Sequence, residues 1–293
     1  MNPPHDDDQF RSRLNLSGNK DRMVLVVALG ILSAVSPMAT DMYLASMPRM
    51  GEFFATPASV VQLTLTSYMI GMAVGQFLLG PISDILGRHR LMVAGNAVFL
   101  LSSVAIALAP SIEVVLALRV LQGVSGAAGV VIARAAVSDM ASGRQAAKLF
   151  SLLATISSLA PVLAPLVGGV IATVAPWQTV FWALTLFGAL MLACSVFVVP
   201  ETLPRHLRHR GGLKAVASNS WSVLSTPSFM AYALAFGFTF GTLFSYISAS
   251  SFVVQNVLGY SALAYSVIFA VNAGGMILGA WPTPAWWTAW SRP

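Results

Sequence analysis

Charged residues and cysteine are scarce in this chain. Only 9% of its 293 residues are charged, against roughly 25% in an ordinary soluble domain, and 57% are hydrophobic. Its one cysteine, Cys194, lies in the apolar run "FGALMLACSVFVV", which excludes a disulfide framework and a paired cysteine metal site. We interpret Cys194 as a core residue, and the composition as that of a membrane protein.

The apolar segments also lack the groups that carry enzyme chemistry. They hold no nucleophile beside a base, no cluster of metal ligands and no pair of catalytic carboxylates. The sequence therefore predicts that the protein is not an enzyme, and it predicts no metal and no cofactor.

Eight apolar runs are each long enough to cross a hydrocarbon core of roughly 30 Å as helices. They cover approximately residues 23–47, 60–80, 91–109, 112–137, 149–175, 177–199, 229–254 and 262–281. We therefore expect an all-α, polytopic bundle of transmembrane helices in a lipid bilayer.

The basic residues are distributed unevenly between the loops. Most of the 16 Lys and Arg residues precede span one or follow spans two, four and six, whereas the opposite loops hold only Arg49. Because cytoplasmic loops carry an excess of Lys and Arg, this bias predicts a cytoplasmic N-terminus. The same placement explains the net charge of +6 without a nucleic-acid partner.

Two ionisable residues fall inside predicted spans, Asp41 in "ATDMYLASMP" and Arg119 in "IEVVLALRV". A charge at such a depth costs about 2.5–3.5 kcal/mol and usually has a partner. Residue counts place both in the outer halves of their spans, so we expect a direct or water-bridged pair. Burial disfavours the charge on Asp41 and Arg119 favours it, so protonation would respond to whatever enters the cavity. Alternatively, Asp41 faces water at the headgroups and Arg119 snorkels to the outer interface.

Four further residues lie on the same half of spans one, two and four, and we include them in the predicted cavity. They are Tyr43, Gln62, Tyr68 and Gln122. Their alternative role is ordinary packing or contact with the membrane interface.

The loop between spans two and three reads "GPISDILGRHR", residues 80–90. Asp84 can accept hydrogen bonds from Arg88 or from the N-terminus of a neighbouring helix, and Gly87 permits a tight turn. The stretch thus predicts a contact that joins two helices, although it is also compatible with an ordinary charged loop.

This stretch resembles the G-x-x-x-D-x-x-G-R-[RK]-x signature of the major facilitator superfamily. Residues 118–129, "LRVLQGVSGAAG", and residues 160–169, "APVLAPLVGG", are similar to the family's fourth-span segment and antiporter motif, and "ARAAVSDM" ends span four. With "TDMYLASMP" and "PETLP", the chain resembles the bicyclomycin/chloramphenicol resistance branch of the drug:proton antiporters.

The resemblance implies a fold of two pseudo-symmetric six-helix bundles around a midplane cavity. It implies that Asp41 is tied to proton coupling and that Arg119 is its required counter-charge. The residues that it implies for a cytoplasmic gate are Gly80, Asp84, Gly87, Arg88, Arg90, Arg134 and Asp139. The last two alternatively mark only the membrane boundary.

The antiporter motif also has a physical rationale. Pro161 and Pro165 weaken the hydrogen-bond ladder of their helix, and Gly168 and Gly169 allow a neighbouring backbone to approach closely. Such a helix can bend, and it can pack closely enough against a neighbouring helix to seal the space between them.

Family members have twelve spans, and only eight are expected here. We divide the chain into a disordered cytoplasmic tail (1–22), a six-helix bundle (23–200), a cytoplasmic linker (201–226), the first two helices of an incomplete second bundle (227–281) and an aberrant Trp- and Pro-rich tail (282–293). Either a frameshift or truncation produced this tail, or the protein is a genuine short form with an aromatic anchor at the interface.

The leading functional hypothesis is proton-driven export of small amphipathic drugs, similar to chloramphenicol or bicyclomycin, across a bacterial inner membrane by alternating access. The alternatives are a non-transporting membrane fragment and a solute importer on the same fold. Self-association or a full-length transporter partner would complete the cavity wall.

Overall fold

Helices make up all of the regular structure in the part of the chain that the computed structural model describes, residues 19–204, 206, 208 and 225–279. Eight helical segments in this part are long and apolar enough to cross a membrane, which confirms the predicted all-α class and the predicted number of spans. After the first span they are α5 (Ala58–Leu86), α6 (Arg88–Ala107), α7 (Ile112–Met140), α8 (Gly143–Val174), α9 (Gln178–Phe197), α11 (Pro227–Phe252) with its π-helical continuation η3 (Val253–Val257), and α12 (Ala262–Gly279).

The first span is broken rather than continuous. It consists of α2 (Asn19–Ser33), α3 (Val35–Asp41), the 3-10 turn η1 (Leu44–Ser46) and α4 (Met47–Phe53). Pro48 lies in the first turn of α4, where a proline is tolerated because its missing N–H would have no helical partner. The span therefore extends beyond the predicted end at residue 47, and its two-residue break directly follows Asp41.

Several other helices are longer than their apolar runs. Helix α5 continues past Gly80 to Leu86, and α8 begins at Gly143 rather than near residue 149. The added turns carry polar residues, which stay helical at the ends of a span where water is available. Helix α2 begins at Asn19, inside the predicted tail; the rest of that tail, most of the linker and residues 282–293 lie outside the described residues.

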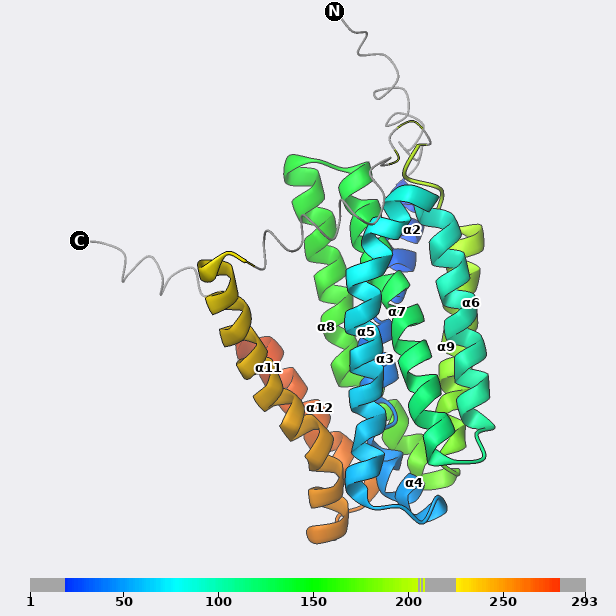
Figure 1. Ribbon diagram of the computed structural model, residues 1–293, viewed down its shortest axis with the longest axis vertical. Coiled ribbons are helices and arrows are strands. Elements are labelled where there is room, and N and C mark those ends of the chain that lie inside the picture. The colour runs from blue at the N-terminus through cyan, green and yellow to red at the C-terminus, as the bar shows by residue number, and fades with distance from the viewer. Residues whose placement is uncertain (1–18, 205, 207, 209–224, 280–293) are drawn as a thin grey trace, which may run out of the picture.

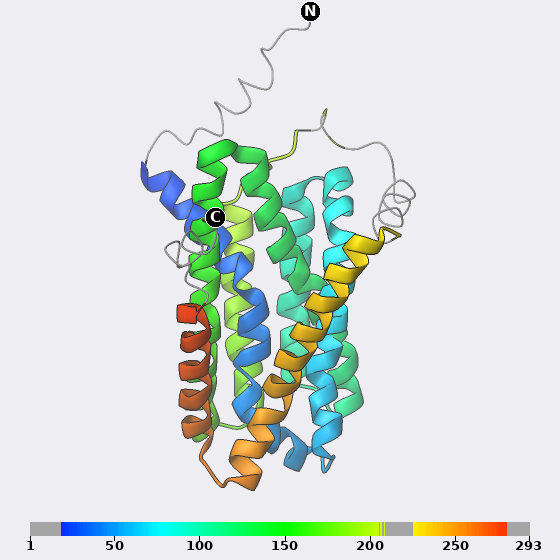
Figure 2. The ribbon, with the colours of Figure 1, turned by 90° about the vertical axis from the view of Figure 1, so that its left-hand side faces the viewer.

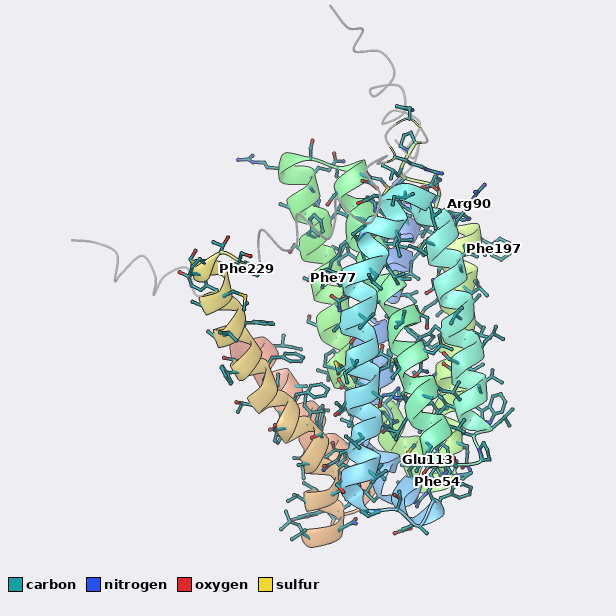
Figure 3. The ribbon with its side chains drawn as sticks, in the orientation of Figure 1. Phe54, Phe77, Arg90, Glu113, Phe197 and Phe229 are labelled. Atoms are coloured by element: carbon teal, nitrogen blue, oxygen red, sulfur yellow. The ribbon has the colours of Figure 1, made fainter. Side chains whose placement is uncertain are left out.

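The bundle has two ends, which we name for their contents. The basic end holds the α5–α6 turn at Gly87, and the Phe54 end is the opposite one; Figure 3 labels Arg90 at the first and Phe54 at the second. Helix α7 packs against α5 and α6, α6 packs against α9, and α8 packs against α2 and α12. Figure 1 shows α11 close to the bundle at the Phe54 end and leaning away from it at the basic end. Figure 2 shows α11 crossing in front of the bundle, with α12 beside α8.

Glycines bring α5 and α7 into direct backbone contact. A Cβ atom added to Gly123 would meet the carbonyl oxygen of Tyr68, and one added to Gly71 would meet that of Val120. Small residues at a crossing allow helices to approach closely where no water-driven hydrophobic effect holds them together. This crossing fixes α7, which carries Arg119, against the helix that carries Tyr68.

Candidate functional site

A cavity of about 720 Å³ lies between α8, α11 and α12, with Asp41 in its wall. Its lining is mostly apolar. The polar lining residues are Asp41, Ser151, Thr155, Ser158, Tyr246 and Asn272. Among the described residues that line it, Asp41 is the one charged side chain, so the cavity suits an amphipathic molecule better than an anion.

Asp41 is buried, with 7% of its surface exposed, at the C-terminal end of α3. The Oγ1 atom of Thr40 lies 2.7 Å from the Asp41 carboxylate and 2.9 Å from the carbonyl oxygen of Ser36. A hydroxyl has one proton, so Thr40 donates to Asp41 when the carboxylate is ionised. When the carboxyl is protonated, it donates to Thr40, which then donates to Ser36. Both protonation states of Asp41 are therefore hydrogen-bonded.

Arg119 is fully buried inside the first bundle. Its guanidinium donates to the carbonyl oxygens of Thr64 (3.2 Å) and Ala39 (3.0 Å) and to Oε1 of Gln122 (2.7 Å). The same group lies over the rings of Tyr43, Tyr68 and Phe181, 4.4, 4.6 and 5.9 Å from their centroids. Carbonyl dipoles and aromatic faces thus surround the cation.

Of the expected direct or water-bridged pair between Asp41 and Arg119, the direct form is wrong, and the water-bridged form stays a prediction. Arg119 forms no ion pair with a carboxylate in the described part of the chain. Its side chain reaches Ala39, two residues before Asp41, whereas the Asp41 carboxylate is held by Thr40 and faces the cavity. Residue counting gave the right neighbourhood but not the directions of the side chains. Burial also excludes the two alternatives, Asp41 at the headgroups and a snorkelling Arg119.

None of the other four residues predicted for the cavity lines it. Tyr43 and Tyr68 belong to the aromatic surround of Arg119, and Gln122 links Arg119 to Ser103, whose Oγ accepts from Nε2 at 2.7 Å. Gln62 on α5 donates instead to the carbonyl oxygen of Ser248 on α11, at 3.3 Å. The residues that sequence reasoning missed here are Thr40, Thr64, Ser103 and Phe181, of which only Thr40 had a signal, its place beside Asp41.

Helix α8 continues through both of its prolines. Pro161 lines the cavity, and because Pro165 has no N–H, the carbonyl of Pro161 has no helical donor. Gly168 faces the carbonyl oxygen of Met42 in the break of the first span, and Gly169 faces the side chain of Ser266 on α12. The motif thus places α8 against both the broken span and the second half of the chain.

A charged cluster at the basic end centres on Arg88. Its guanidinium pairs with Asp84 (2.6 Å) and Asp139 (3.1 Å) and also donates to the hydroxyl of Ser83. These groups come from the ends of α5, α6 and α7. Thr202 donates to the same carboxylate oxygen of Asp139 at 2.9 Å. One arginine therefore joins three helices.

Glu201 caps the N-terminus of α6. Its Oε1 accepts from the backbone N–H of Arg88 at 2.9 Å, and its Oε2 pairs with Arg208 at 3.0 Å. A carboxylate at this position satisfies a free N–H group and complements the helix dipole. Gly87, with φ of 99°, turns the chain here, and a Cβ atom would collide with Glu201 and Arg208. The sequence predicted that Asp84 accepts from Arg88 or from the N-terminus of a neighbouring helix; Asp84 pairs with Arg88, and the N-terminus of α6 is capped by Glu201, which the sequence analysis missed.

The structure brings Asp84, Gly87, Arg88 and Asp139 together from the predicted gate. It does not bring in the other three: Arg90 and Arg134 are exposed, and Gly80 faces Val131 with room for a side chain. The cluster members that sequence reasoning missed are Ser83, Glu201, Thr202 and Arg208. Glu201 and Thr202 had a signal in "PETLP", where an acid directly follows an apolar run, and Ser83 lies within "GPISDILGRHR".

We expect Arg88→Ala to lower the free energy of unfolding by about 2 kcal/mol, because it leaves two partly buried carboxylates without their cation. The matched control is Arg90→Ala, an exposed arginine two residues away, for which we expect a change within about 0.5 kcal/mol. Denaturation in mixed detergent micelles measures both. Equal losses for the two variants would contradict the central place of Arg88.

The sequence pattern of the Major Facilitator Superfamily matches residues 29–292. The chain belongs to this superfamily of membrane transporters. An uncharacterized MFS-type transporter, YdgK of Bacillus subtilis, is 38% identical over 89% of the chain and 65% of its own length. The bicyclomycin resistance protein homolog of Haemophilus influenzae is 32% identical over 90% and 67%, and the chloramphenicol resistance protein of Pseudomonas aeruginosa 30% identical over 92% and 63%. This major facilitator chain thus spans about two thirds of the length of these relatives.

Solved structures agree with the major facilitator fold. A bacterial homolog of the human lysosomal transporter Spinster, in an inward-facing and unoccupied conformation, matches with a TM-score of 0.72 at 18% identity, over 89% of this chain and 62% of that one. A D-xylose-proton symporter matches with a TM-score of 0.65 at 17% identity, over 86% and 65%. At these identities the likeness concerns the fold alone.

Proposed function

We propose that this major facilitator chain carries the proton-binding part of an exporter of small amphipathic drugs, similar to chloramphenicol or bicyclomycin. The exporter works by alternating access in a bacterial inner membrane, with the N-terminus in the cytoplasm. The names of the relatives support the drug class, and the excess of Lys and Arg at the basic end supports the orientation.

The observation that carries the proposal is a buried carboxyl in the wall of a largely apolar cavity. Asp41 takes a proton or releases it without losing its hydrogen bond to Thr40, so the proton can exchange while the helix stays intact. A drug that enters the cavity removes water from Asp41 and changes which protonation state is favoured. Drug and proton then compete for one site.

The remaining predicted residues receive supporting roles. Arg119 holds the carbonyl of Ala39 and so fixes the segment that presents Asp41, in place of a direct counter-charge. The cluster around Arg88 closes the basic end when its ion pairs form. Antiporter-motif residues Gly168 and Gly169 keep α8 close to the first span and to α12. Self-association or a full-length partner would add to the cavity wall.

Asp41→Asn tests the proposal, because asparagine keeps the shape of the side chain but cannot exchange a proton. We expect proton movement after addition of chloramphenicol, followed by a pH-sensitive dye in proteoliposomes, to fall at least about tenfold. Glu113→Gln, an exposed acid at the Phe54 end (Figure 3), is the matched control and should behave as the parent.

Two outcomes would overturn the proposal. If Asp41→Asn retains the parent's drug-dependent proton movement, Asp41 is not the coupling group. If the parent itself shows none, the chain is a non-transporting membrane fragment under these conditions, which was the principal alternative.

A further inference from the structure

Backbone carbonyls at the break in the first span are contacted from several sides. From α7, Arg119 donates to the carbonyl of Ala39, and from α8, Gly168 lies against the carbonyl of Met42. The chain resumes after Tyr43 in a 3-10 turn, a conformation with poorer hydrogen-bond geometry than the α-helix. Within this turn the carbonyls of Tyr43 and Leu44 accept from the N–H groups of Ser46 and Met47, and each carbonyl oxygen keeps a second lone pair that a donor from another helix can use.

The second half of the chain supplies two such donors. Ser251 at the end of α11 donates to the carbonyl oxygen of Leu44 at 2.5 Å. Gln255 in η3 donates through Nε2 to the carbonyl oxygen of Ala45 at 3.2 Å and to Oγ of Ser251 at 2.9 Å. The carbonyl oxygen of Leu44 accepts the 3-10 bond from the N–H of Met47, and Pro48 has no N–H to add a second, so one lone pair of that oxygen is left for Ser251. Both protons of the Gln255 amide are used.

At these contacts α11 is attached to the first span. Ser250 and Ser251 are the only buried residues of α11, a helix that the structure describes in full, and Ser251 is not exposed at all. Gln62 of α5 adds a third bond at the same end, to the carbonyl oxygen of Ser248. From this end α11 leans away from the bundle (Figure 1).

The cavity lies entirely on one side of these bonds. Its lining residues on α11, among them Tyr246, precede Ser251, and those on α12 begin at Phe269, beyond the Phe54-end start of that helix. The bonds to Leu44 and Ala45 therefore stand between the cavity and the Phe54 end. Gln255 lies in the π-helical turn η3, and π-helical turns recur at functional sites.

We propose that Ser251 and Gln255 form a latch that closes the Phe54 end of the cavity by binding the backbone carbonyls of the broken first span. The acceptors lie three and four residues after Asp41 on the same segment. Release of the latch frees the segment that presents Asp41, so opening of this end and a change around the carboxyl occur together. The hydrogen bonds of the latch form whether or not the chain transports a substrate. Only the role of the latch in a transport cycle rests on the proposed function.

A cysteine at position 46 reports on the latch. Ser46 lies beside Ala45, is 1% exposed, and its hydroxyl has no hydrogen-bond partner among the described residues, so Ser46→Cys changes little. The test places it in a Cys194→Ala background, in lipid nanodiscs, with a water-soluble maleimide. We expect Ser251→Ala and the isosteric Gln255→Glu each to raise the labelling rate about fivefold, the factor expected for the one hydrogen bond to the broken span that each variant loses.

Two controls separate the latch from general loosening. Ser245→Ala removes an exposed hydroxyl on α11 whose one hydrogen bond among the described residues is to the carbonyl of Gly241 in the same helix, and it should leave the rate unchanged. Ser102→Cys, a buried reporter on α6, should label no faster in either latch variant. Unchanged labelling at position 46, or an equal rise at both reporters, overturns the latch. Loss of drug-dependent proton movement in the parent overturns only the proposed function, because the labelling uses neither drug nor gradient.

Discussion

Arg119→Ala is expected to lower the free energy of unfolding by about 3–5 kcal/mol, measured by denaturation in mixed detergent micelles. The substitution removes the donor from two backbone carbonyls and from Gln122, and it leaves a cavity between three aromatic rings. Arg119→Lys should recover only part of the loss. An ammonium keeps the charge, but it lacks the planar fork that reaches Thr64 and Ala39 together while stacking on the rings.

The control for this prediction lies on the same helix. Arg134 is exposed and forms no ion pair with a described residue, so Arg134→Ala should change stability by no more than about 0.5 kcal/mol. If Arg119→Ala and Arg134→Ala cost the same, the bonds around Arg119 do not hold the broken span. Drug-dependent proton movement should be lost with Arg119→Ala even when enough folded protein is recovered.

Gly168→Ala is expected to cost about 3 kcal/mol in the same assay, from a single added methyl group. The new carbon would overlap the carbonyl oxygen of Met42, which belongs to the backbone and cannot rotate away as a side chain could. Either α8 moves away from the first span, or the backbone at Met42 in the break of that span shifts. Both changes alter the wall of the cavity beside Asp41.

The matched substitution is Gly241→Ala on α11, where an added Cβ atom meets nothing within 4 Å. It should cost nothing, and the higher helix propensity of alanine favours a small gain. A loss for Gly168→Ala no larger than that for Gly241→Ala would show that α8 tolerates a wider separation from the first span.

The sequence predicted the spans well because burial in a bilayer imposes a minimum length of apolar residues. It predicted the ends of α5 and α8 less well, since the polar residues of helix ends resemble those of loops. The break after Asp41 had no signal at Met42 and Tyr43 themselves, where neither glycine nor a polar run stands; the nearby signal was Pro48, which lies in the first turn of α4.

The site was predicted in part for similar reasons. Asp41, Arg119, Arg88 and Asp139 stand out because charge is rare in such a chain. Their partners do not, because Arg119 binds backbone carbonyls, which every residue has. Ser251 and Gln255 were missed because hydroxyl and amide groups are common on membrane helices, and only the folded chain shows which of them face a carbonyl.

The pairing of Glu201 with the start of α6 and with Arg208 changes the length of the tether between the two halves. The sequence placed a linker at residues 201–226, but the chain is fastened to the first bundle as far as Arg208. Only the residues after Arg208 separate the fastened part from α11. A shorter tether raises the effective concentration of one half near the other. In the proposed transport cycle, re-closing is therefore an intramolecular encounter that the cluster at the basic end makes more frequent.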